Sequence, residues 1–238
     1  LDVSFASPDL GPIGRALGHA TGGSVDLEAR VSGTFAALSG RASVEAKGLL
    51  LPGDLRLAAA SGRVELGAGE AGAANGQLVL QGLARRGEKE ALVEQASVAI
   101  KGTRQAHEIR LVAKFPGEMS AQALLDGGLV PGARLPEWRG RLEAMSTAGL
   151  TDFALAAPAT LVLSAGRFEL GEALFAGEPG RIRLAATRWT PAGLETRGSS
   201  YAVVVRTLRR MLKLQGEMGS NLVLAGEWDV RAGESGEG

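Results

Sequence analysis

The stretch SVDLEARV, residues 24–31, decides the fold class, because its polar and apolar residues alternate without a break. Every second residue is apolar (Val25, Leu27, Ala29 and Val31), and the residues between them are polar (Ser24, Asp26, Glu28 and Arg30). Successive side chains of a β-strand point to opposite faces, so this pattern predicts a strand with one apolar and one hydrated face.

The same alternation returns along most of the chain and predicts about a dozen strands, most of them separated by turns that contain Gly, Pro or Asn. Parallel strands buried on both faces would show continuous apolar runs, so the charged alternate positions favour antiparallel strands. The phrase SGRVELG at 61–67 returns as AGRFELG at 165–171. We interpret it as one strand module, repeated because a long sheet needs many strands.

We therefore predict an all-β fold. It is a long, curled, mainly antiparallel sheet, trough-like, with an apolar interior and two or three short helices. Residues 1–233 are expected to form a single repetitive segment of a longer protein, and 234–238 a flexible tail. Helical structure is expected as a short turn within 7–20 and as helices at 119–127 and 201–215. In the last of these, apolar and basic residues share opposite faces at helical spacing.

Composition excludes several classes of protein. The chain of 238 residues has 26 basic and 26 acidic residues, whereas a nucleic-acid-binding protein usually carries a basic excess. It has no Cys, which excludes disulfides and thiolate metal sites. No apolar run is long enough to cross a membrane as a helix. With 35 Gly and only 4% aromatic residues, we expect many turns and a thinly filled interior.

No constellation of catalytic residues is recognisable, and we expect a protein that is not an enzyme and uses no metal or cofactor. The sequence contains neither a zinc-protease, a serine-hydrolase nor a phosphate-loop motif. The two histidines are His19 and His107. His107 begins a predicted strand without an obvious catalytic partner, so a structural role is expected for it.

The predicted strands define a candidate binding surface, formed by apolar residues that should all point into one interior. They are Val25, Leu27, Leu78, Leu80, Val98, Ile100, Ile109, Leu111, Leu142, Phe153, Leu155, Leu161, Leu163, Phe168, Leu170, Ile182, Leu184, Leu222 and Leu224. The charged residues between them should face water, namely Asp26, Glu28, Glu45, Arg110, Arg141, Glu143, Glu169 and Arg183.

Several phrases in this order resemble the repetitive body of the TamB family, within the AsmA-like group of bacterial envelope proteins. They are SGTFAALSGRASVEAKGL (32–49), KGTRQAHEIRLVAK (101–114), WRGRLEAMSTAG (138–149), FALAAPATLVLSAGRFEL (153–170) and NLVLAGEWDVRAG (221–233). The resemblance covers roughly residues 20–233 and lies in phrases and spacing, without a catalytic signature.

The resemblance implies an interior segment of a periplasmic protein that is anchored in the bacterial inner membrane by a part outside this sequence. Members of the family form a taco-shaped trough with an apolar inside. They are linked to phospholipid movement toward the outer membrane. They are also linked to the assembly of outer-membrane β-barrels and autotransporters, with the barrel protein TamA as partner.

Two functions follow as expectations, and they depend on different parts of the sheet. In the first, the apolar residues conduct phospholipid acyl chains between the two membranes. In the second, an exposed sheet edge shelters nascent outer-membrane strands. A third interpretation, a surface adhesin or a β-helix enzyme acting on polysaccharide, is less favoured, because the one Tyr and three Trp are scattered along the chain.

Overall fold

The computed structural model of the chain describes residues 1–12, 21–33, 39–51, 53–69, 71–131, 136–149, 152–178, 180–204 and 223–233. Strands make up 77% of the structure and helix 1%, and the strands form one long antiparallel sheet. The predicted all-β class and the antiparallel pairing are therefore confirmed. None of the described residues form a helix with the length and apolar character needed to span a bilayer.

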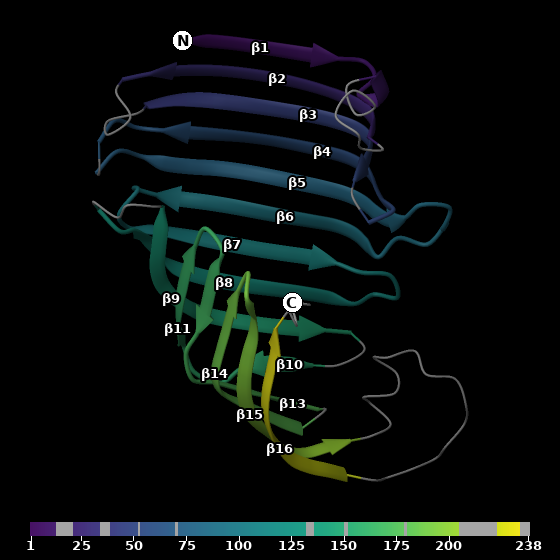
Figure 1. Cartoon of the computed structure of the whole chain (residues 1–238), viewed down its shortest axis with the longest axis vertical. Helices are drawn as coiled ribbons and strands as arrows, with labels where there is room; N and C mark the ends of the chain where they lie inside the picture. Colours follow the sequence, from purple (N-terminus) through teal and green to yellow (C-terminus); the bar gives the residue numbers. More distant parts are fainter. Residues whose placement is uncertain are drawn as a thin grey trace, which may run out of the picture. The chain divides into compact units, whose positions relative to one another are not determined.

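The described residues form sixteen strands, and most of these follow one another as hairpins (Figure 1). Their bounds are β1 (Asp2–Ser7), β2 (Gly22–Ser32), β3 (Ser39–Leu51), β4 (Leu55–Leu66), β5 (Ala74–Arg85), β6 (Val93–Gly102), β7 (His107–Lys114), β8 (Ser120–Leu129), β9 (Glu137–Ala148), β10 (Phe153–Leu155), β11 (Ala159–Ser164), β12 (Arg167–Leu170), β13 (Ala173–Gly177), β14 (Gly180–Thr190), β15 (Gly193–Val204) and β16 (Val223–Gly233).

The chain divides into two compact units, Leu1–Ser120 and Ala121–Gly238. The prediction of a single segment over 1–233 stays a prediction, and the tail 234–238 lies outside the described residues. In unit 1, strands β1 to β7 pair in chain order, and each registered pair is antiparallel. Figure 1 shows these strands side by side in one layer.

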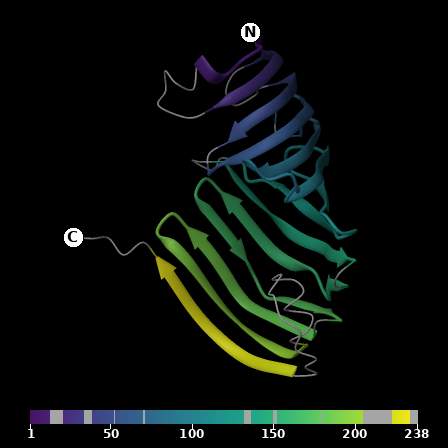
Figure 2. The same cartoon turned by 90° about the vertical axis from the view of Figure 1, so that its right-hand side faces the viewer.

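Unit 2 is also an antiparallel meander, but two of its positions are each occupied by two short strands that lie end to end. Strand β9 pairs with β11 through Glu137–Leu142 and with β10 through Ser146 and Thr147, so β10 and β11 lie end to end along it. Strands β12 and β13 likewise lie end to end along β14. Each short pair is one strand interrupted by irregular residues, and Pro158, which has no N–H, lies in the first interruption. The longer strands β14 to β16 bend along their length (Figure 2).

The predicted helix at 119–127 is wrong, because these residues belong to the hairpin of β8 and β9. The Val130 N–H donates to the Glu137 carbonyl oxygen at 2.8 Å, and Gln122 Nε2 donates to Ser146 Oγ at 3.0 Å. A helix of about nine residues is marginal by itself in water. Pairing with β9 satisfies the backbone instead, and this tertiary contact overrides the local preference.

The other two helical predictions fall partly outside the described residues. Residues 201–204 continue β15, so the helix predicted from 201 is wrong there, and 205–215 are not described. Val203 and Val204 are β-branched and favour a strand. In the segment 7–20, Ser7 ends β1, only Gly11 and Pro12 are helical, and 13–20 are not described.

Glycines make room for two of the three tryptophans. A Cβ built on Gly140 would lie 2.5 Å from the Trp138 ring and 2.7 Å from Gly127 Cα. Trp138 therefore lies over a close approach of β8 and β9 and is buried. In the same way, a Cβ on Gly198 would overlap the ring of Trp228, its cross-strand partner. Such glycine–aromatic pairs hold the register of neighbouring strands.

We expect Gly140→Ala to lower the free energy of unfolding by about 1–3 kcal/mol, because the added methyl group overlaps the Trp138 ring and the β8 backbone. Gly62→Ala is the matched control, because the atoms nearest to its Cβ would be Leu78 Cδ1 at 3.1 Å, the Gln77 carbonyl oxygen at 3.2 Å and Val44 Cγ1 at 3.4 Å. Urea unfolding measures both variants. Equal effects would show that the glycine under Trp138 is not required.

Candidate functional site

The first candidate surface is the apolar face of unit 1, which is defined by strand register. Residues directly opposite each other in an antiparallel pair lie on the same face. The paired residues Phe5, Leu27, Val44, Gly62, Leu78, Val98 and Leu111 form one such row across all seven strands. On one side of it lies the row of Ser7, Val25, Ala46, Ala60, Leu80, Ala96 and Ala113. On the other lies the row of Val3, Ala29, Ala42, Val64, Gly76, Ile100 and Ile109.

These three rows contain no charged residue, and Ser7 is their only polar side chain. Of their members, only Ala46 is buried, while Val3, Phe5 and Val64 are each about 40% exposed. No large side chain anywhere in the described residues is fully buried. Within unit 1, no second layer of the described residues covers this largely aliphatic face.

The second candidate surface is the apolar face of unit 2, and β15 shows which residues belong to it. Leu194, Thr196, Gly198 and Ser200 alternate regularly along β15 and lie opposite Trp189, Thr187, Leu184 and Ile182 of β14. A bulge at Ala185 keeps these β14 residues on one face, although their spacing in the sequence is irregular. The pairings of β14 extend the face to Phe168, Leu170, Ala173 and Phe175, and from there to β10, β11 and β9.

Unlike the face of unit 1, this face is largely filled by its own side chains. Trp138, Leu142, Ala159, Leu161, Leu170, Ala173 and Phe175 are all buried. The rings of Phe153 and Phe175 stack with centroids 5.5 Å apart and an interplanar angle of 15°. Aromatic rings supply much buried area, so unit 2 has a small packed core where unit 1 has an open surface.

Register brings the predicted inward residues together within each unit. Val25, Leu27, Leu78, Leu80, Val98, Ile100, Ile109 and Leu111 lie on the apolar face of unit 1. Leu142, Phe153, Leu155, Leu161, Leu163, Phe168, Leu170, Ile182 and Leu184 lie on that of unit 2. Leu224 is on the same face of unit 2 but 44% exposed, and Leu222 lies outside the described residues.

Sequence reasoning missed Trp138, Phe175 and Trp189, which contribute to the face of unit 2. Trp138 is in phase with Leu142, but Gly140 between them weakens the apparent alternation. Phe175 and Trp189 follow the irregular residues near Gly171 and Ala185, where the period-two pattern shifts by one residue. A β-bulge shifts the alternation by one residue, so such a shift in the sequence pattern is the signal that would have revealed both residues.

The opposite face of unit 2 carries rows of ion pairs. Arg141 Nε lies 3.4 Å from Glu143 Oε1, Arg183 Nη2 lies 2.7 Å from Glu172 Oε1, and Arg197 Nε lies 3.1 Å from Asp229 Oδ2. Each pair joins a positive and a negative side chain, so these pairs leave no concentrated charge on this face. This face of unit 2 is therefore a hydrated exterior surface.

Glu169 differs from the freely solvated residue that the alternation predicts. It points away from the apolar face, but Arg167 Nη2 donates to its Oε2 at 2.7 Å and Arg188 Nε donates to its Oε1 at 2.6 Å. Its side chain is only 27% exposed. The hydrogen bond from Arg167, and then that from Arg188, lowers the pKa of the Glu169 carboxyl, although partial burial acts in the opposite direction.

His107 is buried at the start of β7, where its Nδ1 donates to the Thr103 carbonyl oxygen at 2.8 Å. This bond closes the turn between β6 and β7, which is a structural role. Among the described residues, no three His, Asp or Glu side chains are grouped as a metal ion would require.

No family model matches the chain, and neither a curated protein nor a solved structure is significantly similar to it.

We expect Glu169→Gln to lower stability at pH 7. A carboxylate whose folded pKa is depressed stabilises the protein above its ordinary value of 4.5, and this contribution is lost as the pH falls through the lower folded pKa. The difference between wild type and variant should therefore shrink below pH 4.5 and in high salt. Thermal unfolding across pH measures it. Glu28→Gln is the control, because Glu28 lies opposite the neutral Ser4 and Ser43. A Glu169→Gln effect that does not change with pH would contradict the ion-pair explanation.

Proposed function

We propose that this chain is a segment of a TamB- or AsmA-like scaffold that spans the periplasm and conducts phospholipid between the inner and outer membranes. In this proposal the acyl chains lie on the apolar face of unit 1. The partner at the outer membrane is a TamA-like barrel protein that meets another part of the same scaffold. No catalysis is involved.

The observation that carries the proposal is the open aliphatic face of unit 1. An apolar sheet face is stable in water only when something covers it, such as a second layer, the curled sheet itself or a ligand. In the described part of unit 1 there is no such layer. Exposed apolar patches of this kind mark sites for apolar ligands or partners.

The energetics suit transport. A face covers one side of an acyl chain, so a chain of about 16 carbons would gain roughly 6 kcal/mol relative to water, at about 0.8 kcal/mol per fully buried methylene. Relative to a bilayer, which surrounds the whole chain, transfer to the face costs about 6 kcal/mol, because the outer side of the chain stays exposed. The surface can therefore protect a lipid from water without trapping it.

The apolar face of unit 1 keeps the same aliphatic character from one strand to the next. Its central row holds only aliphatic residues and glycine from Leu27 to Leu111. A charged or hydrogen-bonding side chain on this row would hold a headgroup or exclude a chain at one point. Without one, successive positions have similar affinity, which movement along the sheet requires. The face of unit 2 suits this role less well, because its own rings and leucines occupy it.

A second candidate function rests on a different feature, the open edges of the sheet. In the described residues β1 pairs only with β2, and β16 only with β15. Unpaired edges accept extended segments of other chains. The chain would then assist the assembly of outer-membrane β-barrels or autotransporters, as a sheltering edge for their strands.

The conduit proposal predicts that Leu80→Arg abolishes lipid binding. Leu80 lies between Ala60 and Ala96 on the apolar face of unit 1, so the guanidinium would enter the acyl-chain position at a cost of several kcal/mol. The purified chain is incubated with vesicles of phosphatidylethanolamine and phosphatidylglycerol, reisolated, and its bound lipid is measured by mass spectrometry. Loss of most of the bound lipid is expected.

Gln81→Arg is the matched control. Gln81 is adjacent in sequence, faces the opposite side, and lies between the uncharged Ala59 and Gln95. A photo-crosslinking residue at position 80 should label lipid, and one at position 81 should not. Equal lipid binding by the two folded Arg variants, or equal labelling at both positions, would overturn the conduit proposal and favour the edge-pairing function.

A further inference from the structure

The two edge strands of the sheet lack several of the devices that usually block pairing with another chain, although β1 has only 6 residues and β16 carries charged side chains. Such devices include proline, lysine, bulges and short length. Neither β1 nor β16 contains proline or lysine, and β16 runs for 11 residues. Val3 and Phe5 of β1 are 40% and 41% exposed, and Val230 of β16 is 43% exposed. Both edges are therefore open to a further strand, within the described part of the chain.

The hydrogen bonds of Leu1 show which backbone groups of β1 point outward. The Leu1 amine donates to the Val31 carbonyl oxygen at 2.7 Å, and the Val31 N–H donates to the Leu1 carbonyl oxygen at 2.9 Å. Antiparallel residues alternate between pointing their backbone groups toward one neighbour and toward the other. The odd residues of β1 therefore bond to β2, and the N–H and C=O groups of Asp2, Ser4 and Ala6 point away from it.

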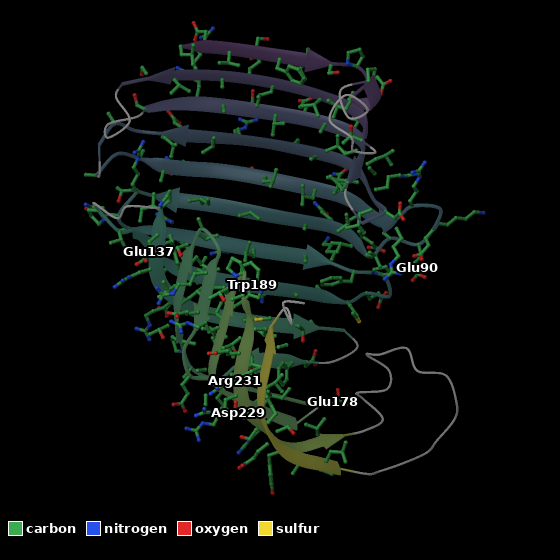
Figure 3. The ribbon with its side chains drawn as sticks, viewed as in Figure 1. Glu90, Glu137, Glu178, Trp189, Asp229 and Arg231 are labelled. Carbon is green, nitrogen blue, oxygen red and sulfur yellow. The ribbon has the colours of Figure 1, made fainter. Side chains whose placement is uncertain are left out.

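Strand β16 alternates polar and apolar residues as β1 does. It has the basic Arg231 near its end, whereas β1 begins with the acidic Asp2. Trp228 and Val230 lie on its apolar face, and Asp229 and Arg231 lie on the other, where both project from the strand (Figure 3). Arg231 lies opposite Glu195 of β15, and Asp2 forms an ion pair with Arg30 of β2 at 3.5 Å. Arg231 near the end of β16 and Asp2 at the start of β1 therefore carry opposite charges, and they can pair when the two edges meet.

We propose that β16 of one molecule pairs antiparallel with β1 of a second copy of this chain, with Asp2 of the second copy opposite Arg231. This register creates a row of alternating charge across four strands, from Glu195 through Arg231 and Asp2 to Arg30. On the apolar face, Val3 meets Val230 and Phe5 meets Trp228, an aromatic cross-strand pair. The proposal does not depend on the function proposed for the apolar face.

Charge selects this register over its neighbours. Only a shift by two residues keeps the apolar residues of both strands on one face. A shift in one direction places Asp2 opposite Asp229, a pair of like charges directly across the strands, which is destabilising. A shift in the other direction places Asp2 opposite Gly233 and loses both the charge pair and the contact between Phe5 and Trp228.

The topology of the sheet permits the same contact to repeat. Strands β10 and β11 together occupy one position of the meander, and so do β12 and β13. The sixteen strands of the described residues therefore occupy fourteen positions of an antiparallel meander. The first and last positions of an even meander run in opposite directions. The contact joins two different strands, β16 of one copy and β1 of the next, so it is heterologous and leaves one edge of each copy free for a further copy.

Cysteine crosslinking tests the register, since the natural chain has no Cys. Ala6→Cys and Glu227→Cys molecules are mixed and mildly oxidised. In the proposed register these residues lie directly opposite, within the Cα separation of about 4.4–6.8 Å that a disulfide needs. A heterodimeric disulfide is expected. Ala6→Cys with Val223→Cys is the matched control, because four residues of offset place the thiols too far apart to bond while Asp2 and Arg231 stay intact.

Ser4→Pro tests the assembly without disturbing the fold. It removes an outward-pointing N–H of β1 and leaves the bonds to β2 intact. Only six residues pair, so the contact is weak. Sedimentation of the wild type should show mass rising with concentration up to about 1 mM, past the dimer. Ser4→Pro should remain monomeric with an unchanged circular dichroism spectrum. A wild type that stays monomeric, equal crosslinking of the control pair, or Ala6→Cys crosslinking mainly to itself would overturn the proposal.

Discussion

Hydrogen bonding between neighbouring strands is the interaction on which this structure depends, because little else connects one strand to the next. Unit 1 has no second layer in the described residues, and its face buries few side chains. The ladder therefore carries the register, and the register decides which side chains share a face. A slip of one residue would replace the apolar residues of a strand with those of its opposite face, which are mostly polar. Turn glycines with positive φ, such as Gly53 and Gly87, fix the hairpins that prevent such a slip.

Much of this could be predicted from the sequence, because the decisive signal is local. The alternation in SVDLEARV identifies both a strand and its apolar side, and it holds wherever strands are regular. The helix expected at 119–127 failed because its residues suit a helix locally, whereas β9 offers a paired strand that no local pattern reveals. The interruption near Gly171 and the bulge at Ala185 shift the pattern and hid Phe175 and Trp189. Glu169 alternates correctly, but its two arginine partners come together only through the pairing of β12 with β14.

The two units use the same architecture for different surfaces. In unit 1, alanine, valine and leucine in register leave a smooth face, since small side chains reach little beyond the backbone. In unit 2, Trp138 over two glycines and the stacked Phe153 and Phe175 fill the space above the sheet. The few aromatic residues of the chain are therefore not spread evenly. Their concentration in unit 2 distinguishes a face that packs against itself from one that is available to a ligand.

A meander in which each position of the sheet bonds only to the adjacent positions also determines how the molecule responds to force. Tension applied to an end peels the outermost strand from the next one, and the bonds of one ladder break in sequence while the others stay intact. Stability in such a chain is close to a sum over adjacent pairs, as in repeat proteins. Loss of one strand shortens the sheet and leaves the remainder folded. The sheet should therefore resist strand separation least at its edges and most where Trp138 and the stacked Phe153 and Phe175 join several strands.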